Sequence, residues 1–178
     1  MSRIGKLPVA LPAGVKGAIS GSVVSVEGPK GRLSFSVRSG VKVELQEGKF
    51  LVALVGSDSQ SKADYGTTRA TLNNMVKGVS AGWKKVLELN GVGYTAKLQG
   101  KNLVLAVGFS HDVVMPVPEA IKCAIVKNTI ELESADKELL GTFAAKARDV
   151  QPPEPYLGKG IKYSDEKVRR KAGKTGKK

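Results

Sequence analysis

Two glycines near the middle of the chain stand in a pattern that some nucleotide-binding enzymes use. The segment Gly91-Val92-Gly93-Tyr94-Thr95-Ala96 matches the permissive dinucleotide fingerprint G-x-G-x-x-A and follows a predicted strand. That fingerprint must open a helix whose N-terminus faces a pyrophosphate. The residues from Tyr94 to Leu98 instead alternate between apolar and polar types, as in a strand. We therefore interpret Gly93 as part of a turn or bulge, where it serves backbone geometry or close packing.

Two other short patterns lack the context that their chemistry requires. Gly173-Lys174-Thr175 resembles the end of a phosphate-binding loop, but Val168 stands where that motif needs a glycine. Ser110, His111 and Asp112 are adjacent, whereas the members of a catalytic triad converge from distant positions. We expect His111 to have a surface or loop-bracing role.

Metal and acid–base chemistry find equally little support. The chain has one cysteine, Cys123, and one histidine, too few for a zinc site, and the cysteine is expected to be a buried structural thiol. The acidic residues are mostly isolated on strand faces or at helix starts. The sequence thus predicts no catalytic residue, no metal and no cofactor, and the protein is not expected to be an enzyme.

A more specific arrangement lies near the C-terminal end, where prolines lead into cations spaced by glycines and flanked by tyrosines, between Pro152 and Tyr163. Glycine lets backbone approach phosphate closely, cations neutralise the phosphate, and a tyrosine ring can stack on an unpaired base or ribose. The alternative is a flexible linker, which seldom carries tyrosine beside lysine. The predicted RNA-binding residues here and in the following stretch are Tyr156, Gly158, Lys159, Gly160, Lys162, Tyr163, Lys167, Arg169, Arg170, Lys171 and Lys174.

The charge balance agrees with a polyanionic partner. Lysine and arginine number 29 against 16 acidic residues, giving a formal charge of +13 and a pI near 9.9. Residues 151–178 hold nine of the cations and three of the anions, so almost half of the excess lies in the last 28 residues. Lysines beside predicted turns, Lys30, Lys49, Lys101 and Lys127, could meet phosphate, although solvation explains them equally well. A basic DNA-associated architectural protein would share these features.

No apolar run approaches the roughly 18 residues that a membrane span requires, and the N-terminus lacks the apolar stretch of a secretory signal. We expect the protein in the cytoplasm.

The elements that must position these residues follow from hydrophobic periodicity. Alternating segments between Ala18 and Val55 predict an antiparallel meander, and apolar residues at helical spacing from Asp58 to Gly78 predict a helix that packs on it. Asp58 or Ser59 is a plausible N-cap. Gly66 inside this helix indicates that something packs closely there, because glycine costs about 1 kcal/mol relative to alanine, and Arg69 is expected to face outward.

The same order of strands and then a helix recurs between Trp83 and Val150. Overlaying Leu33 on Leu103, at an offset of 70, suggests an internal duplication. The predicted fold is α+β, with two duplicated domains, residues 1–82 and 83–150, each an antiparallel β-sheet packed against one α-helix. Residues 151–178 are predicted to form an extended basic C-terminal tail that binds RNA but buries no core, so removing them should leave a folded protein.

Several independent motifs also stand in the order of a known family. They are Ser2-Arg3-Ile4-Gly5-Lys6 with Pro8, Val26 to Gly31, Gly66-Thr67-Thr68-Arg69 with Asn74 to Val79, Gly91 to Tyr94, Gly108 to His111, and Pro153 to Tyr163. On these motifs the sequence resembles the bacterial form of the universal large-subunit ribosomal protein six, over essentially its whole length.

This resemblance implies a structural constituent of the large ribosomal subunit with two related α+β domains. It implies binding to 23S rRNA near the sarcin–ricin region and a place at the stalk base, beside neighbouring large-subunit ribosomal proteins, where translation factors dock. Arg3, Lys6 and Arg69 join the predicted rRNA-binding residues. The family usually has a lysine after the signature tyrosine, and Leu157 stands there, so one phosphate contact is not expected in this chain.

Overall fold

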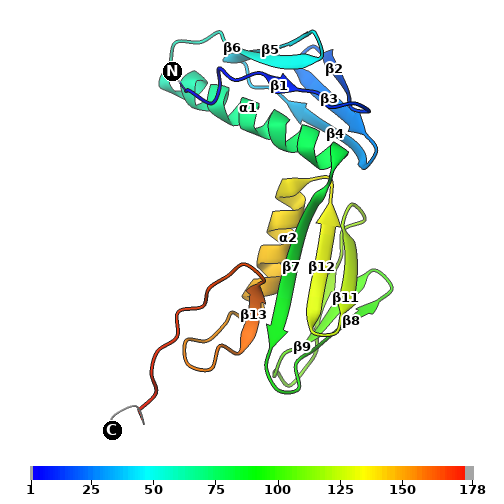
Figure 1. The fold of residues 1–178 in the computed structure, drawn as a ribbon, viewed down its shortest axis with the longest axis vertical. Helices are drawn as coiled ribbons and strands as arrows, with labels where there is room; N and C mark the ends of the chain where they lie inside the picture. Colours follow the sequence, from blue (N-terminus) through cyan, green and yellow to red (C-terminus); the bar gives the residue numbers. More distant parts are fainter. Residues whose placement is uncertain (1, 175–178) are drawn as a thin grey trace. The chain divides into compact units, whose positions relative to one another are not determined.

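The computed structural model describes residues 2–174 and divides into two compact units. The change from one unit to the other falls between Trp83 and Lys84, and the short stretch 135–137 belongs with the first unit. Figure 1 shows the order of the elements along the chain.

The first unit contains two antiparallel three-stranded sheets, ordered β1-β6-β5 and β2-β3-β4. The predicted antiparallel strands are thus confirmed, but they form two sheets rather than one. Strands β5 and β6 are joined by a tight two-residue turn. Its residues, Glu47 and Gly48, both have positive φ, 48° and 72°, as such hairpin turns require. The elements are β1 (Val9–Ala10), β2 (Lys16–Ser20), β3 (Val23–Gly28), β4 (Gly31–Ser36), β5 (Val41–Gln46), β6 (Lys49–Leu54) and α1 (Ser59–Ser80).

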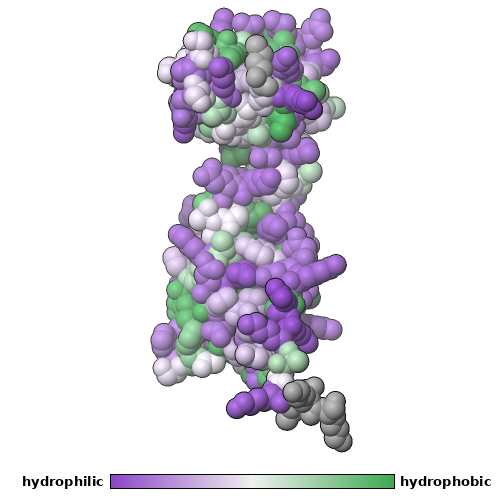
Figure 2. Space-filling model, turned by 90° about the vertical axis from the view of Figure 1, so that its left-hand side faces the viewer, coloured by the Kyte–Doolittle hydropathy of each residue, from purple (hydrophilic) through white to green (hydrophobic). Residues whose placement is uncertain are grey.

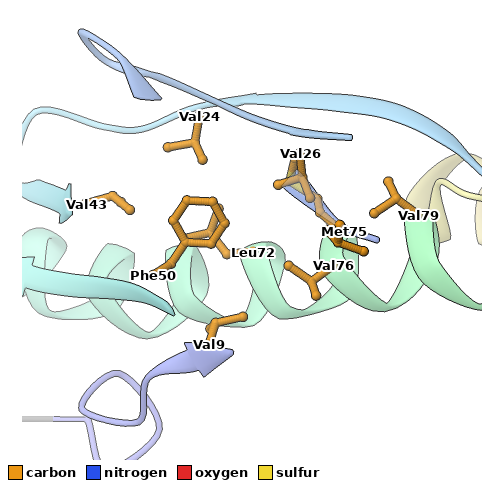
Figure 3. Close-up of a cluster of buried hydrophobic side chains, with 10 residues drawn as sticks. Val9, Val24, Val26, Val43, Phe50, Leu72, Met75, Val76 and Val79 are labelled. Carbon is orange, nitrogen blue, oxygen red and sulfur yellow. The ribbon is translucent and has the colours of Figure 1, made fainter. Parts of the chain in front are cut away.

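Helix α1 begins where the sequence predicts it. Asp58 is the N-cap, and its side chain accepts a hydrogen bond from the Ser61 backbone N–H at 3.0 Å. The apolar face of the helix covers the strands, and Figure 3 shows Leu72 of α1, Phe50 of β6 and Val24 of β3 converging in this core. All three are fully buried.

The second unit also contains two sheets, ordered β10-β9-β8 and β11-β12-β7-β13, together with one helix. Its helix buries Leu140, Phe143, Ala144 and Ala147. The elements are β7 (Trp83–Asn90), β8 (Thr95–Gln99), β9 (Asn102–Ala106), β10 (Val113–Pro116), β11 (Lys122–Val126), β12 (Thr129–Ser134), α2 (Lys137–Asp149) and β13 (Gly160–Tyr163).

The strand orders agree with a duplication but correct its register. The sheets β1-β6-β5 and β2-β3-β4 recur as β7-β12-β11 and β8-β9-β10. The central strand β3, with buried Val24 and Val26, therefore corresponds to β9, with buried Leu103 and Leu105, at an offset of 79 residues. The overlay of Leu33 on Leu103 was wrong because it matched an edge strand to a central one, and both kinds share the same alternating pattern.

The tail prediction is wrong for its first part. Strand β13 pairs antiparallel with β7, and its Ile161, opposite Leu89, is fully buried. Composition concealed this strand because it spans only four residues and has one large aliphatic side chain. After Tyr163 the described residues, up to Lys174, form no further helix or strand, which agrees with an extended segment there.

Gly93 has φ +79°, and nothing lies within 4 Å of a Cβ added to it. Its role is therefore backbone geometry, not close packing. We expect Gly93→Val to lower the free energy of unfolding by about 1–2 kcal/mol, because the left-handed conformation is strained for an L side chain. Urea denaturation measures this. Gly141→Ala, inside α2 with equally open space and no positive φ, should instead stabilise by up to about 1 kcal/mol, and equal effects at the two sites would contradict the interpretation.

Candidate nucleic-acid interface

The segment between α2 and β13 forms a closed loop, residues 151–159, which we call the proline loop. The Ile161 N–H donates to the Gln151 carbonyl at 2.7 Å, and the Glu154 N–H donates to the Lys159 carbonyl at 2.9 Å. Prolines limit φ along its first arm. The turn at its tip carries Tyr156 and Leu157, both exposed. The loop thus presents an aromatic ring to solvent on a braced backbone.

The two predicted glycines of this loop have structural roles within the chain. Gly158 has φ +74°, and Gly160 has φ +140°. A Cβ on Gly160 would lie 2.6 Å from the Pro152 carbonyl oxygen, and one on Gly158 would lie 3.1 Å from the Arg170 guanidinium. Both glycines are buried, so close approach to this protein's own groups explains them. Their contact with RNA stays a prediction.

The chain after β13, residues 164–174, is the C-terminal segment, and it runs back along the proline loop. The Ser164 N–H donates to the Val86 carbonyl at 3.0 Å. Further on, the Lys171 N–H donates to the Pro155 carbonyl at 2.7 Å, and Arg170 packs over Gly158. The proline loop and the C-terminal segment, which carry most of the predicted cations, are therefore in contact with each other.

An ion pair fixes the start of the C-terminal segment. The Arg148 guanidinium, in the last turn of α2, donates from Nε to Glu166 Oε2 at 2.8 Å and from Nη2 to Oε1 at 2.5 Å. Glu166 Oε2 also accepts from the Tyr163 N–H at 3.2 Å. The Arg148 hydrogen bond holds the pKa of Glu166 below its ordinary value, and the same bond raises the pKa of Arg148. Sequence reasoning missed this pair, which no local motif signals.

Most predicted cations of this region are exposed. Within residues 2–174, six of them form no ion pair with a carboxylate: Lys159, Lys167, Arg169, Arg170, Lys171 and Lys174. Lys162 differs, since its Nζ lies 2.8 Å from Glu88 Oε2 in the neighbouring strand. Figure 2 shows strongly hydrophilic side chains projecting from the lower part of one face. Six charges without partners in one region suit a polyanion.

The two tyrosines are not equivalent. Tyr163 is half-buried, Lys85 Nζ lies 5.1 Å from its ring centroid, and burial raises the pKa of its hydroxyl. Tyr156 is 55% exposed. Of these two tyrosines, Tyr156 is therefore the one whose ring is available to stack on a base.

The first unit holds the other predicted site residues. Arg3 and Lys6 are exposed in an N-terminal segment that lies against α1. Arg69 is half-buried, and its Nε donates to the Leu7 carbonyl at 3.1 Å, so this side chain anchors the segment. A Cβ on Gly66 would lie 3.1 Å from Ser2 Oγ, which confirms the predicted close packing there.

The turn lysines behave individually. Lys101 pairs with Glu119 at 2.5 Å, whereas Lys127 is exposed at the β11–β12 turn with φ +54°. Lys49 is exposed at the β5–β6 turn, and the backbone N–H of Lys30 donates to the Val79 carbonyl at 2.9 Å.

The patterns that suggested enzyme chemistry do not assemble a site. The residues after Gly93 form strand β8, which confirms that the glycine pattern does not open a helix. Ser110, His111 and Asp112 lie together in an exposed turn. Cys123 is half-buried, and burial raises the pKa of its thiol. Among the described residues no group of three His, Cys, Asp or Glu side chains is placed to hold a metal ion.

None of the described helices is both long enough and apolar enough to span a membrane.

The two units share an α+β arrangement, and the second unit carries an exposed tyrosine and cations that form no ion pair with a carboxylate among the described residues. The profile of the family described as "Ribosomal protein L6" matches residues 11–82 and again residues 90–164. The chain belongs to this family, whose members are structural proteins and not enzymes. The double match also supports the duplication and includes β13 in the second repeat.

Curated relatives cover the full chain. The chain is 49% identical to the large ribosomal subunit protein uL6 of Helicobacter hepaticus over all of both chains. It is 47% identical to the proteins of the same name from Oleidesulfovibrio alaskensis, over 99% of this chain and 98% of that one, and from Campylobacter jejuni, over all of both. The expected localisation, on the ribosome in the cytoplasm, agrees with this family.

Proposed function

We propose that this chain is a structural constituent of the large ribosomal subunit that binds 23S rRNA near the sarcin–ricin region and the stalk base. There it contacts neighbouring large-subunit proteins and supports the region where translation factors dock. The RNA is held mainly by the proline loop and the C-terminal segment. Arg3, Lys6 and Arg69 of the first unit supply a second contact.

One observation carries this proposal: the proline loop and the C-terminal segment together hold an exposed tyrosine and six exposed cations without carboxylate partners, on a backbone held by β13 and by the Arg148–Glu166 pair. Cations without partners release the counterions of the RNA without first breaking an ion pair. A tyrosine on a braced loop loses little conformational freedom when it stacks on a base. Family membership supports the ribosomal context.

The test compares two triple variants of the full chain that lose the same charge. Lys167, Arg169 and Lys171 are changed to Gln in one, and the exposed Lys97, Lys122 and Lys146 of the same unit in the other. Binding to 23S rRNA is measured across salt concentrations. We expect the first variant to flatten the log–log salt slope by roughly 2, at about 0.7–0.9 per lost phosphate contact. The second should leave the slope nearly unchanged.

Equal slopes in the two variants would show that the C-terminal segment is only solvated. Chemical footprinting of 23S rRNA with the wild-type chain tests the location, and protection away from the sarcin–ricin and stalk-base regions would contradict it. Competition with duplex DNA addresses the architectural-protein alternative, because a DNA-binding protein should exchange RNA for DNA at equal phosphate concentration.

A further inference from the structure

Four loops meet at the end of the second unit where β7 stops. The Leu89 N–H donates to the Asn128 carbonyl at 2.8 Å, which brings the β11–β12 turn to this end. Gly160 at the start of β13 pairs with Asn90, which brings the proline loop there. The end of β7 lies in the lower part of Figure 1.

The β9–β10 turn, Gly108–Asp112, belongs to the same end. Thr95, just after the β7–β8 turn, pairs with Ala106 near the end of β9. A Cβ on Gly108 would lie 3.4 Å from the Tyr94 ring, so the two turns are in contact. We call the four loops together the loop end of the second unit.

The loop end exposes an unusual share of apolar surface. Of the twelve large hydrophobic residues that are exposed in the described chain, five lie in these loops or directly beside them. Val92, at 95% exposure, contributes nothing to the core, and Phe109 is 48% exposed. The five are Val92, Phe109, Val126, Tyr156 and Leu157. Apolar groups gathered at one end of a unit mark an interaction surface.

Within this surface Phe109 and His111 form a stacked pair. Their ring centroids are 6.2 Å apart and their planes differ by 22°. Both side chains are exposed, as is Ser110 between them. A near-parallel pair of aromatic rings in solvent offers a flat face to a third planar group.

Cations complete the surface. Lys127 is exposed at the β11–β12 turn, and it is one of two non-glycine residues with positive φ in the described chain. Lys159 and Arg170 adjoin from the proline loop and the C-terminal segment. Flat rings bordered by cations match a nucleotide, whose base stacks while its phosphate pairs with a charge.

We infer that the β9–β10 turn is a base-stacking site, in which the Phe109–His111 pair binds an unpaired base of the RNA and Lys127 meets its backbone. This rests on the proposed function and extends it, because the turn contributes none of the residues assigned there. A protein that covered the apolar side chains of the loop end would also have to cover the charges of Lys127, Lys159 and Arg170. RNA can instead pair its phosphates with these charges, so RNA is favoured.

The experiment separates stacking from charge. Full-length Phe109→Ala, Phe109→Trp and Val114→Ala variants are titrated with 23S rRNA at several salt concentrations; Val114 is an exposed control in strand β10. We expect Phe109→Ala to weaken binding roughly 5- to 100-fold with an unchanged salt slope. Phe109→Trp should bind like the wild type, and Val114→Ala should have no effect. Lys127→Gln should instead flatten the slope by about 0.7–0.9.

Wild-type affinity of Phe109→Ala would overturn the stacking site while leaving the proposed function intact. A wild-type chain that failed to bind 23S rRNA would overturn the proposed function itself. If Phe109→Ala bound RNA normally but failed to join large subunits in reconstitution, the turn would contact protein, and the inference would also be overturned. Thermal unfolding of each variant shows whether folding is preserved.

Discussion

Truncation after Gln151 is expected to destabilise the second unit by about 3–5 kcal/mol, whereas truncation after Glu166 should leave its stability nearly unchanged. The first cut removes β13, whose fully buried Ile161 alone contributes about 2 kcal/mol. It also exposes the edge of β7 and leaves Arg148 without Glu166. Because small domains have only about 5–15 kcal/mol in total, such a loss should broaden or abolish cooperative unfolding in urea.

Truncation after Glu166 is expected to change RNA binding but not folding. It removes residues 167–178, which carry seven cations and no acidic residue. We expect the salt slope for 23S rRNA to flatten by about 3 or more, with a thermal unfolding curve close to that of the full chain. A clear loss of stability in the chain cut after Glu166 would contradict this expectation and show that the contacts of Arg170 and Lys171 with the proline loop contribute to folding. Unaltered stability of the longer truncation would contradict the role of β13 in the core.

Elements with a local cause could be predicted from the sequence. The N-cap at Asp58 depends on one side chain and a backbone N–H three residues away, and the fold has both. The β5–β6 hairpin depends on Glu47 and Gly48, which accept positive φ. The apolar stripe from Tyr65 to Val79 defined the buried face of α1 because a 3.6-residue period fits no strand.

Features decided by distant partners could not be predicted in the same way. The four residues of β13 become a strand because the edge of β7 pairs with them and Ile161 is buried there. The division into two sheets leaves no trace in an alternating pattern, which reports one buried face but not the partner strand. The Arg148–Glu166 pair joins residues 18 apart whose types are common on any surface.

The predicted interface divides along the same line. The sequence correctly predicted that most of these cations and Tyr156 are exposed. A segment rich in charged residues, with few apolar neighbours for its aromatic ring, is expected to face solvent. It did not distinguish Lys162, which is paired with Glu88, from Lys159, which is exposed. That difference depends on strand register.

Glu166→Gln is expected to lower the free energy of unfolding of the second unit by about 2 kcal/mol at neutral pH. The Arg148 and Glu166 side chains are 27% and 24% exposed, so the pair is screened less than a surface ion pair but more than a buried one, whose disruption costs about 3–5 kcal/mol. Asp165→Asn is the matched control. Asp165 is the neighbouring carboxylate, is 77% exposed and lies 3.9 Å from Lys85, and its loss should cost little.

The same pair predicts a pH dependence of defined sign. The pKa of Glu166 is lowered in the folded state, so its ionised form stabilises the fold. This contribution is complete above the ordinary value of 4.5 and is lost as pH falls through the lower folded-state pKa. The unfolding free energies of the wild type and Glu166→Gln should therefore differ at neutral pH and converge as pH falls from 4.5 through the lowered pKa of Glu166. A difference that persisted in acid would contradict a charge-based role.

RNA affinity shows whether Glu166 positions the C-terminal segment or acts only through its charge. The two roles predict opposite changes in the RNA affinity of Glu166→Gln. Removing a negative charge beside the C-terminal segment should strengthen binding to a polyanion if charge alone matters. If Glu166 positions the segment, releasing it costs conformational freedom on binding, and affinity should fall about 3- to 10-fold with an unchanged salt slope. Asp165→Asn makes the same change of charge without releasing the segment, so it should bind at least as tightly as the wild type. Tighter binding by both variants would show that Glu166 contributes only its charge, and weaker binding by Glu166→Gln alone would identify it as the residue that directs the C-terminal segment toward RNA.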